Sequence, residues 1–345
     1  MRLIQILEAE KLQVAEGPVP VPGPGEVLLR MGAAGICGSD VHYFFEGRNG
    51  PVLVREPFTP GHEASGVVEA LGEGVEGLRV GTKAAIHPGL PCGVCPACRR
   101  GQENLCQNGI FYGSASIFPH LVGFFRDFIV VAARQVIPVP DHSPVSLGEL
   151  AVSEPLSVAL HAVQRAGPVI GRRVLVTGAG PIGLLVAASL RAGGALEVAV
   201  SDLSDKALSR AASFSDGPFV NAVADGGFFA DRARSFDIAF EASGSPVALK
   251  TCVAATRSGG TVVQVGTLPQ ECNVPTQEIL FRELSYLGVQ RFGWEFSDAV
   301  ALIASRRVDV RPLITHSLPL DRAEEAFLVA RDPDESAKVQ ITGAA

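Results

Sequence analysis

Four of the chain's seven cysteines stand in one short segment, CGVCPACRRGQENLC, and are spaced C-x2-C-x2-C-x7-C. They are Cys92, Cys95, Cys98 and Cys106. Four thiolates on one loop suit tetrahedral Zn²⁺, which such sets hold in closed, structural sites. The iron–sulfur run of ferredoxins has three residues before its last cysteine and a proline after it, whereas this segment has seven residues there and then Gln107. The spacing therefore favours a structural zinc.

A second group of residues offers a mixed ligand set. Cys37 lies in GICGSDVHYFFEG, and His62 and Glu63 lie in TPGHEASGVV. Such residues can converge on a catalytic zinc, which takes three protein ligands and keeps one position open. Neighbours along a regular strand point to opposite faces, but Gly61 permits an irregular backbone that aims both at one point. Asp40 is placed to accept the other ring N–H of His62 and so fix its tautomer. Taken alone, each of these residues is more typical of packing or of the surface.

A glycine-rich turn follows an apolar strand. Gly178, Gly180 and Gly183 match G-x-G-x-x-G, with Pro181 and Ile182 between the last two glycines. The strand RRVLVT precedes the turn and the helical pattern GLLVAASLRA follows it. In that context the motif indicates a dinucleotide whose pyrophosphate binds at a helix N-terminus.

The next strand, EVAVSD, ends in Asp202, 19 residues past Gly183. An acid at this place binds the ribose hydroxyls of NAD and repels the 2′-phosphate of NADP. The residues after it are Leu203, Ser204, Asp205 and Lys206, with no arginine among them. The pattern therefore predicts NAD as the preferred cofactor.

These residues need two kinds of scaffold. Up to about residue 140, short strands alternate with Gly and Pro turns, which predicts an all-β, barrel-like domain over 1–150. Strands and helices alternate over 151–290, which predicts a doubly wound parallel sheet. The tail over 291–345 is expected to return to the first domain. The predicted fold class is thus α/β with two domains.

Composition narrows the function classes. The chain has 345 residues, 47% hydrophobic and 19% charged, with a net charge of −7. Basic residues are not clustered, so we expect no nucleic-acid partner. We also expect no membrane span, because no run of about 18 apolar residues occurs. The N-terminal residues lack a cleavage site, so we expect a cytoplasmic chain with reduced thiols.

These segments in this order resemble the zinc-dependent medium-chain dehydrogenases, and within them the sorbitol and L-idonate 5-dehydrogenase branch. The resemblance covers nearly the whole chain and rests on GICGSDVHY, PGHEASGVV, the cysteine segment, SEPLSVALHA, GAGPIG and AKVQIT. It implies a GroES-like barrel domain in two chain segments, a Rossmann domain, and two zinc ions per chain. It also implies a dimer or tetramer.

The resemblance assigns roles to individual residues. It implies Cys37, His62 and Glu63 as ligands of a catalytic zinc, with Glu154 binding the metal or its water. It implies Ser39 and His42 as a proton relay, Tyr43 in the substrate pocket, and Arg291 near the nicotinamide and the substrate. The same resemblance places two further residues in the cofactor site, Val265 and Gly266.

The expected reaction is hydride transfer between NAD and a secondary hydroxyl of a sugar acid or polyol. The segment 111–131 is more similar to L-idonate 5-dehydrogenase than to sorbitol dehydrogenase, so L-idonate is the expected substrate and sorbitol, xylitol or galactitol the alternative. The aldonate carboxylate needs a basic partner, and the candidates are Arg291, Arg126 and His120. Of these, His120 best distinguishes an aldonate enzyme from a polyol enzyme, because it lies in the segment peculiar to this branch.

Two departures and two alternatives accompany this expectation. Phe292 stands where sorbitol dehydrogenases often have Tyr, and the stretch 213–227 lacks the usual Gly-Ala-Asp turn. One alternative is a zinc-free reductase of the same fold, which would lack Cys37 and His62. The other is a non-enzymatic zinc-ribbon interaction protein, which leaves GHE and GAGPIG unexplained.

Overall fold

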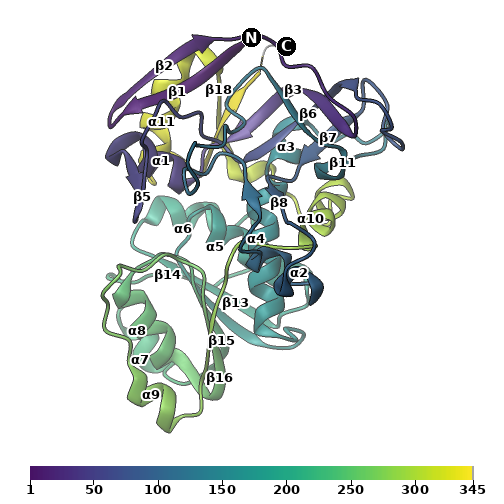
Figure 1. The fold of residues 1–345 in the computed structure, drawn as a ribbon. Coiled ribbons are helices and arrows are strands. Elements are labelled where there is room, and N and C mark those ends of the chain that lie inside the picture. Colours follow the sequence, from purple (N-terminus) through teal and green to yellow (C-terminus); the bar gives the residue numbers. More distant parts are fainter. Residues whose placement is uncertain (344–345) are drawn as a thin grey trace. The chain divides into compact units, whose positions relative to one another are not determined.

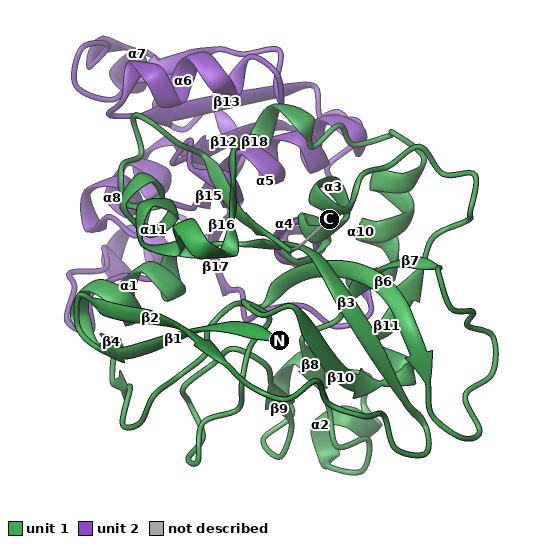
Figure 2. Ribbon diagram, turned by 90° about the horizontal axis from the view of Figure 1, so that it is seen from above, with its two compact units in different colours: residues 1–154, 296–345 green, residues 155–295 purple. Residues whose placement is uncertain are grey.

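The computed structural model describes residues 1–343, which form two compact units (Figure 2). The first unit comprises residues 1–154 together with the chain from 296 onward, and the second comprises residues 155–295. The chain leaves the first unit within α4 (Ser153–Ala166) and returns to it at the start of α10 (Glu295–Ala304).

The first unit is built on a seven-stranded sheet in the order β11-β7-β6-β3-β19-β18, with β10 also paired to β3. Its pairs are antiparallel except for β18 with β19. The strands of this unit are β1 (Arg2–Glu8), β2 (Lys11–Glu16), β3 (Glu26–Gly35), β4 (Arg48–Asn49), β5 (Val52–Leu53), β6 (Glu63–Leu71), β7 (Lys83–Ile86), β8 (Gly89–Leu90), β9 (Ile110–Phe111), β10 (Phe128–Ala132), β11 (Val136–Pro138), β18 (Ile314–Pro319) and β19 (Lys338–Thr342).

Short helices connect and cover these strands. They are α1 (Gly38–Glu46), α2 (Pro96–Arg99), α3 (Leu147–Ala151), α10 and α11 (Ala323–Arg331), with 3-10 turns at η1 (Glu103–Leu105), η2 (Ala133–Gln135), η3 (Arg311–Leu313) and η4 (Leu320–Arg322). Aromatic side chains fill the core that these elements share. Phe58, Phe124, Phe125 and Phe327 are each 1% exposed or less.

The C-terminal strand β19 is essential to the site. It pairs with β3 so that Gln340 faces Gly35, and Ile36 donates its backbone N–H to the carbonyl of Val339 at 2.9 Å. This register brings residues from the end of the chain beside the segment that carries Cys37. β19 lies in the segment AKVQIT, which the sequence analysis singled out, whereas its neighbours β18 and α11 lie in stretches that it did not single out.

The second unit holds a six-stranded parallel sheet in the order β14-β13-β12-β15-β16-β17, as expected for a doubly wound fold (Figure 1). Its strands are β12 (Arg173–Thr177), β13 (Glu197–Asp202), β14 (Phe219–Asn221), β15 (Phe236–Glu241), β16 (Thr256–Gln264) and β17 (Ser285–Gly288). Its helices are α4, α5 (Pro181–Ala192), α6 (Asp205–Ala211), α7 (Gly227–Asp231), α8 (Pro246–Ala255) and α9 (Thr276–Phe281).

Strand order reverses direction at β12, because β13 and β14 lie on one side of it and β15 to β17 on the other. Right-handed crossovers then place helices on both faces of the sheet. In such sheets the carboxyl ends of the strands at the reversal form a ligand crevice. Thr177 and Asp202 are the residues that end β12 and β13.

Within the described residues, no helix combines the length and the apolar composition needed to span a bilayer.

Candidate active site and metal centres

Cys37, His62 and Glu63 come together in the first unit. One ligand atom from each lies within 4.8 Å of the ligand atoms of the other two. Cys37 precedes α1, Glu63 is the first residue of β6, and His62 comes directly before that strand. A sulfur, a nitrogen and an oxygen donor at this spacing suit a zinc ion that keeps an open position.

Gly61 permits the turn that aims His62. Its φ is +97°, a conformation that disfavours residues with a Cβ. A Cβ there would also lie 2.8 Å from the ring of Phe125. Behind the turn, Phe124 donates its backbone N–H to the carbonyl of Gly61 at 2.9 Å, and Gly123 donates to Thr59 at 2.6 Å. The backbone before His62 is therefore held on both sides.

Asp40 joins the two ligand-bearing segments. Its carboxylate is fully buried and accepts the backbone N–H of Cys37 at 2.9 Å and that of Gly61 at 3.2 Å. The predicted hydrogen bond to His62 is absent in this structure, since Asp40 Oδ1 lies 3.7 Å from Nδ1. The two side chains are therefore close enough for an ion pair, but the expected hydrogen bond between them is not formed. Asp40 fixes the segments chiefly through their backbones.

Negative charge dominates this site. Burial acts to lower the pKa of His62, but the charges of Asp40, Cys37 and Glu154 outweigh burial, so the pKa is raised well above its ordinary value. Surroundings that favour a proton on the imidazole also favour a cation bound beside it. The donor set and the charge both fit a zinc ion held by Cys37, His62 and Glu63.

Lys338 is a residue that the sequence analysis missed. It is 2% exposed, and its Nζ donates to Glu63 Oε1 at 2.7 Å and to the carbonyl of Ile36 at 3.1 Å. Burial acts to lower the pKa of Lys338, but Glu63 and Cys37 reverse this and the pKa is raised. A lysine inside the apolar strand AKVQIT was the available sequence signal.

Glu154 lies in the first turn of α4 and is 6% exposed. Its charge contributes to the raised pKa values of His62 and Lys338. It is outside the set of ligand atoms that lie within 4.8 Å of one another. The structure thus brings Glu154 into the electrostatic surroundings of the site without making it a member of the close group.

Three further candidates share helix α1. His42 and Tyr43 follow Ser39 by three and four residues, which puts Ser39 on one helical face with each of them. His42 is exposed, with Nδ1 2.6 Å from Glu46 Oε1. Tyr43 is buried, and its hydroxyl accepts the backbone N–H of Ala115 at 3.3 Å. Glu46, which the sequence analysis did not name, extends this series towards the surface.

The four-cysteine loop forms a second compact group. Its sulfur atoms all lie within 4.8 Å of one another, and Cys95 Sγ is 3.5 Å from Cys98 Sγ and 3.8 Å from Cys106 Sγ. A tetrahedral ion with Zn–S bonds of about 2.3 Å places its sulfurs roughly 3.8 Å apart. The residues therefore fit a four-thiolate zinc. No cysteine of the described residues is in a disulfide.

Backbone N–H groups within the loop favour thiolates. The N–H of Cys98 is the main cause that lowers the pKa of Cys95 to about 6. Burial is the main cause that raises the pKa of Cys98 to about 12. Metal-binding thiols must lose their protons, and the backbone N–H of Cys98 favours the thiolate form of Cys95.

In the second unit, two of the three glycines of the turn, Gly178 and Gly183, have no room for a side chain. Gly178 has a φ of +98°, and a Cβ there would lie 2.9 Å from the backbone of Ala242. A Cβ on Gly183 would lie 1.8 Å from the carbonyl oxygen of Gly178. Gly180 faces open space at the N-cap of α5, and Pro181 and Ile182 begin that helix. The turn leaves Gly180 available for close approach by a phosphate.

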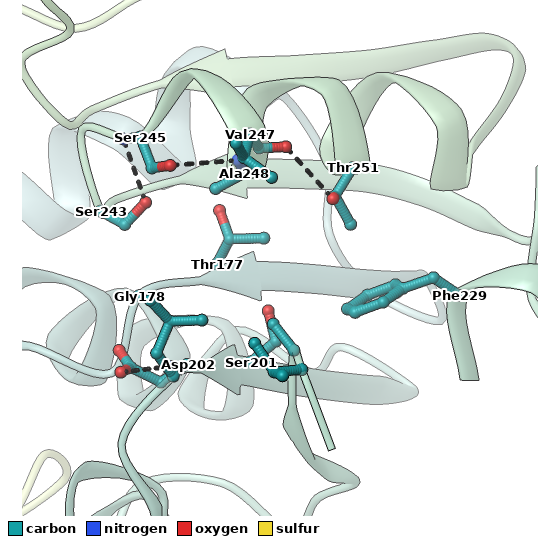
Figure 3. Close-up of a pocket in the computed structure, with 13 residues that line it drawn as sticks. Thr177, Gly178, Ser201, Asp202, Phe229, Ser243, Ser245, Val247, Ala248 and Thr251 are labelled. Carbon is teal, nitrogen blue, oxygen red and sulfur yellow. Dashed lines mark hydrogen bonds between the residues drawn. The ribbon is translucent and has the colours of Figure 1, made fainter. Parts of the chain in front are cut away.

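A pocket of about 480 Å³ opens beside this turn. Figure 3 shows Asp202 at the end of β13 on one side, Ser243 and Ser245 on the other, and Thr177 and Gly178 between them. Leu203, Val223 and Phe229 add apolar lining. Small polar groups beside an apolar wall suit a nucleoside. The sequence analysis named Asp202 and the glycines, but not the serines before α8 or Phe229.

The remaining candidates of the second unit lie at strand ends. Val265 and Gly266 follow β16, and both donate their backbone N–H groups to the carbonyl of Glu241 at 2.8 Å. Arg291 follows β17 with a φ of +50°, and Phe292 after it is buried. The structure gives no contact of Val265 or Gly266 with the pocket beside Asp202.

His120 needs a correction. Its Nε2 accepts the backbone N–H of Arg55 at 2.9 Å, and Nδ1 lies 2.8 Å from the carbonyl oxygen of Ile117. Both ring nitrogens therefore hold the loop together, and neither is available to a substrate carboxylate. Arg126 donates to Met1 Sδ at 3.8 Å beside the N-terminal hairpin. His120 therefore does not supply the donor expected for an aldonate.

The comparisons with known proteins agree with this geometry. Residues 23–141 match the family "Alcohol dehydrogenase GroES-like domain" and residues 181–305 match "Zinc-binding dehydrogenase". L-Idonate 5-dehydrogenase (NAD(P)(+)) of Escherichia coli (strain K12) is 36% identical over 315 residues, covering 91% of each chain. Sorbitol dehydrogenase of Homo sapiens is 37% identical over 324 residues, covering 92% of this chain and 88% of that one.

A solved structure extends the similarity to the whole fold. The crystal structure of L-idonate 5-dehydrogenase from Escherichia coli str. K-12 substr. MG1655 has a TM-score of 0.93 at 34% identity, covering 99% of this chain and 97% of that chain. The predicted fold class, a GroES-like domain with a Rossmann domain, is confirmed. The chain belongs to the zinc-dependent medium-chain polyol dehydrogenase family.

Proposed function

We propose that this protein oxidises a secondary hydroxyl group of a sugar acid or polyol with NAD, at a zinc ion held by Cys37, His62 and Glu63. The observation that carries the proposal is the convergence of these three ligand atoms within 4.8 Å, from two segments of the first unit. When bound there, Zn²⁺ supplies Lewis acidity that lowers the pKa of a ligated hydroxyl.

The residues of α1 have complementary roles in this proposal. Ser39 accepts the hydroxyl proton and His42 passes it on, with Glu46 as the next acceptor because its carboxylate lies 2.6 Å from the ring. Tyr43 is a fixed wall of the substrate site, since Ala115 holds its hydroxyl. Glu154 supports the charge of the site from α4. Arg291 keeps its proposed role beside the nicotinamide and the substrate.

The cofactor proposal rests on the second unit. The turn from Gly178 to Gly183 at the N-terminus of α5 binds the pyrophosphate, and Asp202 binds the ribose hydroxyls. Val265 and Gly266 keep their proposed place in the cofactor site. When bound there, NAD would supply the hydride acceptor of the reaction. We further propose one structural zinc in the cysteine loop, a cytoplasmic location and a homo-oligomer.

L-Idonate is the first substrate we propose, with 5-ketogluconate as its product. Support comes from the segment 111–131 and from the similarity to a protein that carries that name. Sorbitol is the second candidate, because the sorbitol dehydrogenases among the relatives are 37–38% identical to this chain. We no longer propose that His120 distinguishes L-idonate from sorbitol, because both of its ring nitrogens make hydrogen bonds within the loop.

Two measurements test the proposal. The zinc content and NAD affinity of His62→Ala are compared with those of the wild type. We expect one zinc fewer per chain, almost no turnover and unchanged NAD binding. Retained turnover with one zinc would overturn the catalytic centre. Separately, kcat/KM at saturating NAD is measured for L-idonate, sorbitol, xylitol and galactitol. A higher value for any uncharged polyol would replace L-idonate as the substrate.

A further inference from the structure

Lys338 is a buried cation in contact with a proposed metal ligand. Its Nζ lies 2.7 Å from both carboxylate oxygens of Glu63 but makes a hydrogen bond only with Oε1. Glu63 Oε2 is buried and accepts no hydrogen bond. The lysine charge thus lies beside both oxygens, and Oε2, which accepts no hydrogen bond, keeps an unused acceptor site. An unused acceptor on a buried carboxylate is the position from which a metal can be bound.

The lysine is itself held in place. Its Nζ also donates to the carbonyl of Ile36, the residue before Cys37. Its backbone belongs to β19, which pairs with β3 and β18 on either side. Lys338 therefore contacts both ligand-bearing segments, Ile36–Cys37 and Glu63, from a rigid strand.

The charges around the site require a compensating cation. Asp40, Glu63 and Glu154 are buried carboxylates, and a thiolate at Cys37 would add a fourth negative charge. A buried charge without a partner is strongly destabilising. Lys338 meets this requirement for Glu63 whether or not a metal is present.

We propose that Lys338 is a positioning residue for Glu63: its Nζ contacts both carboxylate oxygens, fixes the orientation of the carboxylate beside Cys37 and His62, leaves it one unused acceptor site for the metal, and offsets its charge. The inference rests on the proposed catalytic centre at Cys37, His62 and Glu63. Lys338 should therefore affect both the way Glu63 binds the metal and the stability of the metal-free protein.

The first test is the thermal stability of Lys338→Met with and without zinc. In the metal-free variant, the Glu63 carboxylate is buried without its partner, whereas bound Zn²⁺ supplies a replacement positive charge. The loss of Tm should therefore be larger in the metal-free than in the zinc-loaded protein. By linkage, the variant should release zinc to a chelator at a higher chelator concentration than the wild type.

The second test is the visible spectrum of the cobalt-substituted protein. Without Lys338, both oxygens of Glu63 become free to bind the metal, which raises the coordination number. Four-coordinate cobalt absorbs visible light more strongly than five-coordinate cobalt, so Lys338→Met should weaken the absorption. A role in packing alone would leave this spectrum unchanged.

Gln340→Met is the matched control. Gln340 lies two residues further along β19, is 1% exposed and donates to the carbonyl of Gly148 at 2.8 Å. It should lower the Tm of the metal-free and zinc-loaded proteins equally and leave the cobalt spectrum unaltered. The inference is wrong if Lys338→Met behaves in the same way as this control.

Two further variants keep the outcomes distinct. If Lys338→Met does not yield folded protein, Glu63→Gln is added to it. Recovery of folded protein supports the inference, because the defect is then the unpaired carboxylate, and continued failure overturns it. If instead His62→Ala retains the zinc content of the wild type, the proposed catalytic centre fails, whatever Lys338→Met shows.

Discussion

Asp202 Oδ2 accepts the backbone N–H of Ala179 at 2.7 Å, which ties the end of β13 to the glycine turn before α5. The other oxygen accepts the N–H groups of Leu203 and Ser204 at 2.7 and 2.9 Å. The carboxylate that we propose for ribose recognition is therefore oriented by three backbone donors. It also holds the turn to which we assign the pyrophosphate.

This arrangement predicts the cofactor preference. The wild type should favour NAD over NADP in kcat/KM, because the fixed carboxylate repels a 2′-phosphate. The double variant Asp202→Ala with Leu203→Arg should shift the ratio of the two kcat/KM values towards NADP by about tenfold or more, which is about 1.4 kcal/mol. Affinity for NAD should fall as well, since the N–H of Ala179 loses its acceptor.

Asp205→Ala is the control for that shift. It also removes a carboxylate from the start of α6, but Asp205 accepts a hydrogen bond from Asn221 and does not contact the glycine turn. Its NAD-to-NADP ratio should stay near that of the wild type. A wild type that already prefers NADP would contradict the role we give Asp202.

The cysteine loop should contribute stability and not chemistry. Cys98→Ser should remove one of two zinc ions per chain and lower the Tm, because a structural zinc contributes to folding directly. Turnover per correctly folded molecule should be retained. Cys272→Ser, outside the loop, should change neither zinc content nor Tm to the same extent. A Cys98→Ser protein with normal Tm but no turnover would refute the structural assignment.

Gly61 should be intolerant of a side chain although it is not one of the proposed metal ligands. Gly61→Ala combines left-handed strain of about 1–3 kcal/mol with a Cβ 2.8 Å from the Phe125 ring. We expect a lower Tm and a lower zinc content, because the backbone that aims His62 must move. Zinc per chain and Tm are the measurements.

Gly74→Ala separates strain from contact. Gly74 also has a positive φ, +76°, but a Cβ there meets nothing within 4 Å. It should lower Tm modestly and leave zinc content alone. Equal effects at the two glycines would show that the contact with Phe125 is unimportant.

One ion pair predicts a pH dependence of stability. Burial acts to raise the pKa of Asp127, but hydrogen bonds from the side chain and backbone of Arg2 outweigh burial, so the pKa is lowered. A lowered folded-state pKa means that the pair stabilises the protein above the unfolded value of about 3.9. That contribution is lost as the pH falls through the folded-state pKa.

Asp127→Asn should therefore cost about 1–2 kcal/mol at pH 7, and the difference from the wild type should shrink below about pH 4. Thermal unfolding of both proteins from pH 7 down to pH 2.5 measures this. The Arg2–Asp127 contact, at 2.9 Å, is partly exposed, so added salt should weaken it too. An equal difference at every pH would mean that the substitution acts through packing.

The sequence by itself determined the features that depend on neighbours in the chain. The cysteine spacing places four sulfurs on one loop, and the glycine turn lies between a strand and a helix that its own residues specify. Each of these two sites is formed by residues that are near one another in the sequence, so residue types and spacing are enough to predict its geometry. The parallel sheet followed for the same reason, because alternating strands and helices connect in few ways.

The tertiary structure decided the contacts between distant segments. Lys338 and Glu63 are far apart in the sequence, and only the register of β19 against β3 joins them. The loop around His120 folds back on Arg55, which removes a donor that the sequence analysis had proposed for the substrate. Asp40 and His62 are close without the expected hydrogen bond. Strand register and side-chain packing set such contacts, and neither can be deduced from the spacing of residues within one segment.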